Sequence, residues 1–122
     1  MSRFVLLSHD DPFPHFDFML EDGDTLLTFR LSSFPGQKPF FAEQIGNHRQ
    51  LYLDYEGPVS GGRGQVSRMD FGDFAFADRE EDYMVINLQG KKLLGVMQLD
   101  RTGEKHWLGT FAPAPPHQGI IP

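Results

Sequence analysis

The sequence predicts an all-β protein, a single closed or partly open antiparallel β-barrel with short connecting turns. Many short apolar segments are separated by glycine, proline and aspartate, a pattern typical of barrels and sandwiches. No segment has the 3.6-residue period of an amphipathic helix, and no repeat is found. The 122 residues suit one compact domain, and 12 phenylalanines can supply most of its core.

The first half of the chain predicts a hairpin beside a buried first strand. The hairpin turn contains Gly23, which can adopt a positive φ, and the segments on both sides of it are apolar. The expected elements are a strand at 3–8, a strand at 15–20, a turn at 21–24, a returning strand at 25–31, a loop at 32–39 and a short strand at 40–44.

The second half predicts the strands that close the barrel. A glycine cluster at 60–64 lacks the lysine and the helix of a phosphate-binding loop, so a wide turn is expected. The other expected elements are one bent strand or a strand pair at 65–76, an acidic loop at 77–82, and strands at 83–88, 92–99 and 106–111. The barrel domain should span 1–111, followed by a proline-rich extended tail at 112–122.

The composition excludes several classes of function. The chain has no cysteine, which excludes disulfides, thiolate metal sites and cysteine catalysis. A net charge of −6 argues against a protein that coats nucleic acid, so such contact is expected only at a local site, for example at a strand end. Without a signal-peptide-like start or an apolar run of membrane-spanning length, a cytoplasmic monomer with no membrane contact is expected.

The segment from residue 9 to residue 21 carries the strongest chemical signal. Side chains alternate along a strand, so His15, Asp17 and Met19 should share one face, and the apolar residues 16, 18 and 20 should face the core. His9 joins them if the proline-rich segment at 12–14 folds back. Two imidazoles and a carboxylate suit a divalent cation such as Mn, Fe or Zn, and their face should point into a pocket or into water. The inward faces of the strands are expected to line an interior cleft. Solvated histidines near an aspartate are the alternative.

A second signal is the spacing of His48 and Tyr52. Residues four apart share a face whether the segment is a helical turn or a strand. A histidine and a tyrosine side by side can donate hydrogen bonds to a phosphate or to a developing oxyanion. A half-buried tyrosine beside a solvated histidine is the alternative. His48 could also complete a facial triad with His15 and Asp17, as in a non-haem iron oxygenase.

These motifs together resemble the 3′-phosphoesterase domain of bacterial DNA ligase D, which also occurs as a free-standing protein. The resemblance covers the chain except its tail. It rests on His9-Asp10 and on a second histidine six positions after the first, within His15-Phe16-Asp17-Phe18-Met19-Leu20-Glu21. It continues with His48, Tyr52, Tyr55-Glu56-Gly57, the glycines at 61, 62 and 64, and Trp107-Leu108.

The resemblance implies a manganese-dependent enzyme that trims ribonucleotide-bearing or damaged 3′ ends of DNA or RNA–DNA before ligation. It implies metal ligation by His9, His15 and Asp17, and phosphate contacts by His48 and Tyr52, with His48 as general acid. The 3′ end is the implied partner, together with ligase or polymerase repair proteins. Substrate contacts are expected from Asp10, Glu21, Arg30 and Arg63.

Three basic positions of the family are changed in this chain. Met19 takes the place of an arginine, Ser32 or Ser33 that of a lysine, and Phe40 that of a basic residue eight positions before His48. Arg30, Lys38, Arg49 and Arg63 are the cations available to replace them. A catalytically weakened module that binds metal or nucleic-acid ends is therefore the rival interpretation.

Overall fold

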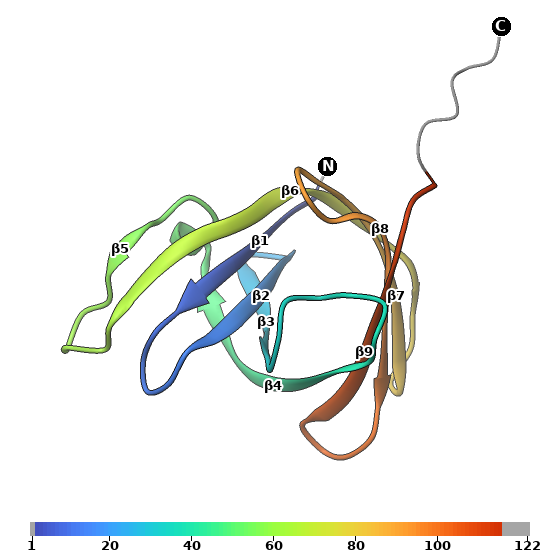
Figure 1. Ribbon diagram of the computed structural model, residues 1–122, viewed down its shortest axis with the longest axis horizontal. Coiled ribbons are helices and arrows are strands. Elements are labelled where there is room, and N and C mark those ends of the chain that lie inside the picture. Colours follow the sequence, from blue (N-terminus) through green and yellow to red (C-terminus); the bar gives the residue numbers. More distant parts are fainter. Residues whose placement is uncertain (1, 116–122) are drawn as a thin grey trace, which may run out of the picture.

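The computed structural model describes residues 2–115, which form nine β-strands and one 3₁₀ turn (Figure 1). Eight strands close into an antiparallel barrel in the order β1-β2-β3-β4-β9-β8-β7-β6, with β6 returning to β1. The predicted all-β barrel is confirmed. The elements are β1 (Ser2–His9), β2 (His15–Asp22), β3 (Thr25–Leu31), β4 (Phe40–Arg49), η1 (Gln50–Leu53), β5 (Gly57–Pro58), β6 (Gln65–Arg79), β7 (Tyr83–Gly90), β8 (Leu94–Arg101) and β9 (His106–Pro113).

The barrel closes through the 15-residue strand β6, which pairs with β1 along its first part and with β7 along its second part. The pairing register shifts between Leu6 and Leu7 on β1 and between Phe76 and Asp78 on β6. Such bulges increase the local twist, and a small closed barrel needs strongly coiled strands. Gly72 on β6 pairs with Gly90 on β7, and a Cβ at Gly72 would clash with the Gln89 carbonyl oxygen.

Alternating side chains divide the apolar residues between two faces. The first cluster takes residues from all eight barrel strands and fills the interior, with Phe18, Phe29 and Trp107 among its largest members. The second cluster lies on the outer face of β1, β2 and β3 and is covered by η1 and the segment that follows it. Its buried members are Val5, Leu7, Met19, Leu26, Leu53 and Val66.

This arrangement corrects one expectation. The cleft was expected inside the barrel, but the interior is filled by apolar side chains. His15 and Asp17 share the outer face of β2 with Met19, and the expected core face of β2 does point inward. The candidate site therefore lies on the outer surface of the barrel, beside the second cluster.

Several boundaries also differ from the expected ones. Residues 65–76 belong to one continuous strand that runs on to Arg79, so the expected acidic loop shortens to Glu80–Asp82. Strand β4 continues to Arg49 before the 3₁₀ turn, and β9 continues to Pro113. Most of the tail expected at 112–122 lies outside the described residues. Within 2–115, no helix has the length and apolar character to cross a membrane.

Candidate metal and anion site

The β1–β2 hairpin brings the two histidines of the predicted metal set together. His9 and His15 are directly opposite each other in the antiparallel register, and their ring centroids lie 4.9 Å apart. The turn between them is anchored by Asp10, whose Oδ1 accepts a hydrogen bond of 2.8 Å from the backbone N–H of Gln65. The turn is therefore tied to β6, and His9 is held next to β2 as the fold-back of this segment predicts.

Asp17 lies between the two imidazoles. Its Oδ2 is 3.3 Å from His9 Nδ1, and its Oδ1 is 3.3 Å from His15 Nε2. The three candidate ligand atoms all lie within 4.8 Å of one another. The His15 and Asp17 side chains are almost completely buried, and that of His9 is 15% exposed. Only the His9 side of the cluster is thus open to solvent.

Backbone carbonyls orient both rings. His15 Nδ1 donates to the Phe13 carbonyl oxygen at 2.7 Å, and His9 Nε2 donates to the Arg63 carbonyl oxygen at 2.7 Å. A carbonyl oxygen can only accept, so the proton of each neutral ring lies on that nitrogen. In the neutral rings, the lone pairs on His9 Nδ1 and His15 Nε2 then face Asp17. His9 Nδ1 is 3.3 Å from Asp17 Oδ2, and only a doubly protonated His9 could donate a hydrogen bond there. Metal-binding histidines are usually oriented in this way, by an outer hydrogen bond from the second ring nitrogen.

The donor set fits a divalent transition metal. His15 Nε2 and Asp17 Oδ1 are buried and have no hydrogen-bond partner. Burying such atoms without a partner is costly, and their neighbour is in each case another electron-pair donor. A cation shared by all three residues would satisfy both atoms. Two imidazole nitrogens and a carboxylate oxygen suit Mn, Fe or Zn.

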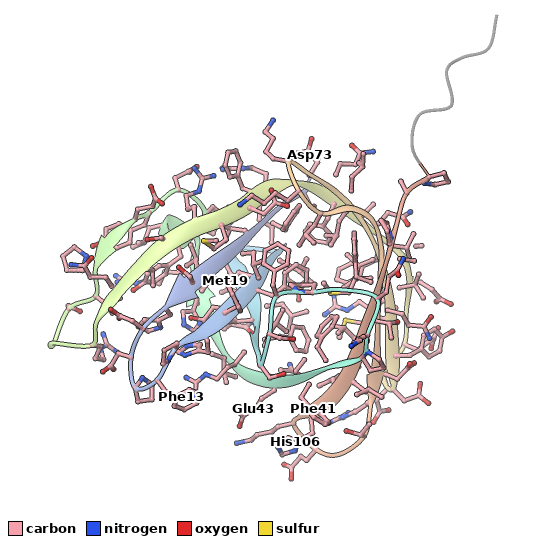
Figure 2. The ribbon with its side chains drawn as sticks, in the orientation of Figure 1. Phe13, Met19, Phe41, Glu43, Asp73 and His106 are labelled. Carbon is pink, nitrogen blue, oxygen red and sulfur yellow. The ribbon has the colours of Figure 1, made fainter. Side chains whose placement is uncertain are left out.

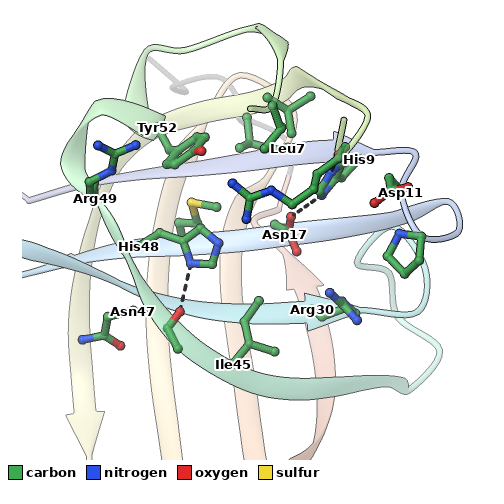
Figure 3. Close-up of a pocket in the computed structure, with 16 residues that line it drawn as sticks. Leu7, His9, Asp11, Asp17, Arg30, Ile45, Asn47, His48, Arg49 and Tyr52 are labelled. Atoms are coloured by element: carbon green, nitrogen blue, oxygen red, sulfur yellow. Dashed lines mark hydrogen bonds and ion pairs between the residues drawn. The ribbon is translucent and has the colours of Figure 1, made fainter. Parts of the chain in front are cut away.

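His48 and Tyr52 line the same hollow, which has a volume of about 570 Å³, together with His9 and Asp17 (Figure 3). His48 is on β4 and Tyr52 is on η1, so they come from different elements, yet their rings meet edge to face at 5.7 Å. His48 Nδ1 donates to the Gly46 carbonyl oxygen at 2.9 Å. Its Nε2 therefore remains as the nitrogen that can meet a ligand.

His15, Asp17 and His48 do not come together as the facial triad of a non-haem iron oxygenase. His48 lies outside the cluster of candidate ligand atoms, where His9 takes the third position beside His15 and Asp17.

Three arginines border the hollow. Arg30, Arg49 and Arg63 all line it. Of the four possible replacement cations, only Lys38 does not line the hollow. Arg63 is held within its own turn by hydrogen bonds to Ser60, whereas Arg30 Nε is buried without a hydrogen-bond partner. Arg49 was not among the expected substrate-contacting residues, although its position next to His48 was the available signal.

Two of the expected substrate-contacting residues, Asp10 and Glu21, do not line this hollow. Asp10 is occupied with the Gln65 backbone, as described above, and borders a neighbouring hollow. Glu21 is at the far end of β2, where its Oε1 accepts from the backbone N–H of Arg3 at 2.6 Å. The structure gives Asp10 and Glu21 roles in holding strands together and does not bring Glu21 to the metal cluster.

The Tyr55-Glu56-Gly57 motif fixes the backbone next to the site through two hydrogen bonds. The Tyr55 hydroxyl donates to the Pro58 carbonyl oxygen, and Glu56 Oε2 accepts from the backbone N–H of Arg68 at 2.7 Å. Gly57 has a φ of 133°, in the region that favours glycine. These contacts fix the segment that covers the second apolar cluster.

The three changed basic positions fall in different environments. Met19 lines the hollow and is 1% exposed within the outer apolar cluster. Ser32 is on the outer surface, bound to the backbone of Phe41. Phe40 points into the barrel interior, so a basic residue at this position could not reach the hollow without a change in the strand.

Fold and site together define a β-barrel protein whose outer face carries a His/Asp donor cluster beside a hollow lined with arginines. The chain matches the model of the DNA ligase D 3′-phosphoesterase domain over residues 7–101, and it belongs to this family. The match includes every residue of the donor cluster and both His48 and Tyr52. No match is found among curated proteins.

Proposed function

We propose that this protein is a metal-dependent phosphoesterase that processes the 3′ ends of DNA or RNA–DNA strands during repair. The observation that supports this most is the pair of buried, unpartnered atoms His15 Nε2 and Asp17 Oδ1, which face each other at 3.3 Å. Both imidazoles are already oriented by carbonyls, so the cluster is prepared for a cation. Manganese is the proposed metal, with His9, His15 and Asp17 as its ligands.

The other residues act on the phosphate. A bound divalent metal would neutralise a phosphate oxygen and lower the pKa of a water molecule. His48 and Tyr52 line the same hollow. As an imidazolium, His48 would donate from Nε2 to a phosphate oxygen and act as general acid, while its Nδ1 donates to the Gly46 carbonyl oxygen, and the Tyr52 hydroxyl would donate to another phosphate oxygen. Arg30, Arg49 and Arg63 supply positive charge around them. Charge-assisted hydrogen bonds from arginine are well suited to phosphate.

Release of inorganic phosphate from a 3′-phosphorylated primer tests the proposal. Wild-type protein should release phosphate with manganese and should not do so after chelation. Asp17→Asn should remove this activity and keep the fold, because the amide has the shape of the carboxylate without its charge. Absence of turnover with manganese, magnesium, zinc and iron would contradict the proposal.

A weakened or non-catalytic module is the second candidate, and the environment of Met19 favours it. A thioether stands at the position of a family arginine, on the face that carries the metal donors. Such a module would bind a 3′-phosphorylated end with metal but would not cleave it. Tight binding in the absence of phosphate release identifies it. In either case the partners we propose are the nucleic-acid end and the ligase or polymerase that uses the processed end, with this chain as a monomer.

A further inference from the structure

A second groove adjoins the metal cluster on the outer face of the barrel. It has a volume of about 410 Å³ and lies across the ends of β2, β3, β4 and β9. Phe13, Glu43, Phe41 and His106 all line it, and Figure 2 shows them on the same side of the molecule. Glu43 and His106 are opposite each other in the register of β4 and β9, so the groove depends on the pairing of these two strands.

Two exposed aromatic rings form its apolar part. Phe13 is 53% exposed and Phe41 is 73% exposed, and neither belongs to the two apolar clusters. The Phe13 ring lies 5.5 Å from the His15 ring, in an edge-to-face arrangement. Phe13 thus packs directly against His15, one of the candidate metal ligands.

The groove and the metal site are continuous. His15 and Arg30 line the groove, Arg30 also lines the hollow that contains Asp17 and His48, and His15 belongs to the donor cluster. The guanidinium carbon of Arg30 lies 5.7 Å from the Phe13 ring centroid, and its buried Nε lacks a hydrogen-bond partner. Arg30 therefore lies between the aromatic rings of the groove and the hollow that contains Asp17 and His48.

We infer that this groove is a nucleobase subsite, in which Phe13 and Phe41 take the base of the nucleotide that carries the 3′-phosphate. The inference rests on the proposed function, since it assigns the part of the substrate next to the phosphate. A nucleotide joins an aromatic base to an anion, which matches phenylalanine rings beside Arg30. Every base has a π face, so stacking of this kind accepts any sequence and needs an unpaired terminal base.

Binding of single strands that end in a 3′-methylenephosphonate tests the inference, because the P–C bond resists hydrolysis. One labelled strand keeps its terminal base, and a second has an abasic terminal nucleotide. Fluorescence anisotropy with manganese then gives the ratio of the two dissociation constants. Stacking on aromatic side chains predicts that wild-type protein prefers the strand with the base on the order of tenfold.

Substitutions locate the preference. Phe13→Leu and Phe41→Leu should each bring the ratio close to one, and Phe13→Trp should keep it. Phe34→Leu is the matched control: Phe34 is 38% exposed and packs edge-on against Phe16, but it does not line the groove. It should retain the full preference. Unchanged melting temperatures confirm that the variants fold.

The preference surviving in both leucine variants, or being absent from wild-type protein, would overturn the inference. A wild-type dimer that Phe41→Leu dissociates, detected by light scattering, would assign the groove to a second copy and overturn it as well. The proposed function fails separately. Equal binding of 3′-phosphonate and 3′-hydroxyl ends, with no phosphate released from a 3′-phosphorylated strand, contradicts that function whatever the phenylalanine variants show.

Discussion

Asp17 and Arg30 are directly opposite each other on β2 and β3, yet their side chains form no ion pair. Both oxygens of Asp17 face the imidazoles of His9 and His15, while the Arg30 guanidinium lies near the Phe13 ring. Because the two charged side chains do not pair with each other, each can bind a charged ligand. The carboxylate is available to a cation, and the guanidinium to an anion.

The first prediction concerns Asp17. Asp17→Asn should abolish manganese binding measured by calorimetry, while the metal-free variant melts at least as high as the wild type. The reason is that the change removes a buried carboxylate whose Oδ1 has no hydrogen-bond partner. In wild-type protein, manganese at 100 times its Kd should add about 2.7 kcal/mol of unfolding free energy. An equal rise in melting temperature for both proteins on adding manganese would contradict this assignment.

The second prediction tests whether His48 acts in catalysis or only stabilises the fold. His48→Ala should lower turnover on the order of a hundredfold, because it removes the proposed proton donor, with manganese affinity and melting temperature nearly unchanged. Asn47→Ala is the matched control, since Asn47 also lines the hollow but donates to the Thr25 hydroxyl. It should keep most of the activity. A large fall in melting temperature for His48→Ala, with activity lost only in proportion to unfolded protein, would make His48 structural.

The clustering of His9, His15 and Asp17 was predictable from sequence because it depends on local rules. Alternation placed His15, Asp17 and Met19 on one face, and a fold-back of the proline-rich segment brought His9 to them. Alternation also placed residues 16, 18 and 20 toward the core, where they lie. The burial of the opposite face was not predictable in the same way. Met19 is as well buried as Phe18, because η1 and the segment after it cover the outer face of β2.

The groove beside the cluster depends on distant parts of the chain. Phe41 and His106 line it together only because β4 pairs with β9, and nothing near either residue indicates that pairing. The sequence indicated Arg49 only as one of four possible replacement cations. The segment around it gave no clear period, because β4 ends there and a 3₁₀ turn begins. Which of these cations line the hollow therefore depends on tertiary structure.

The third prediction concerns pH and the Asp22–Arg79 pair. Arg79 donates to both Asp22 oxygens at 3.1 Å, and chiefly this hydrogen bond lowers the pKa of Asp22. A lowered folded-state pKa gives stability above the ordinary aspartate pKa, and that stability is lost as pH falls through the lowered value. Both side chains are more than a third exposed, so solvent screening keeps the contribution below about 1 kcal/mol.

Arg79→Gln should therefore lower the free energy of unfolding slightly at neutral pH, and the gap should close in acid. Urea denaturation at a series of pH values measures both proteins. Glu81→Gln is the control, because its partner Arg101 is 4.0 Å away and Glu81 is nearly fully exposed. It should have little effect at any pH. A gap that stays constant down to the most acid value would mean that Arg79 acts through packing on Phe76, over which its guanidinium lies.

The last prediction asks which cation binds the phosphate, since the Met19 side chain carries no charge. Arg30→Ala should weaken binding of a 3′-phosphorylated end by about 1.5–3 kcal/mol, the range for a hydrogen bond to a charged group. Lys38→Ala is the matched control, since Lys38 is an exposed loop cation that does not line the hollow. Anisotropy with labelled ends gives both affinities.

Met19→Arg is the complementary change. Met19 is 1% exposed, so an arginine there would be buried without an anion, and the free variant should melt lower. Phosphate or a 3′-phosphorylated end should restore the melting temperature and bind more tightly than to the wild type, since the anion pairs with the new charge. If the variant gains neither affinity nor activity, Arg30→Ala in the wild-type background decides the reason. A sharp loss of end binding means that Arg30 already fills the role, and no loss means that the ligand is not a terminal phosphate.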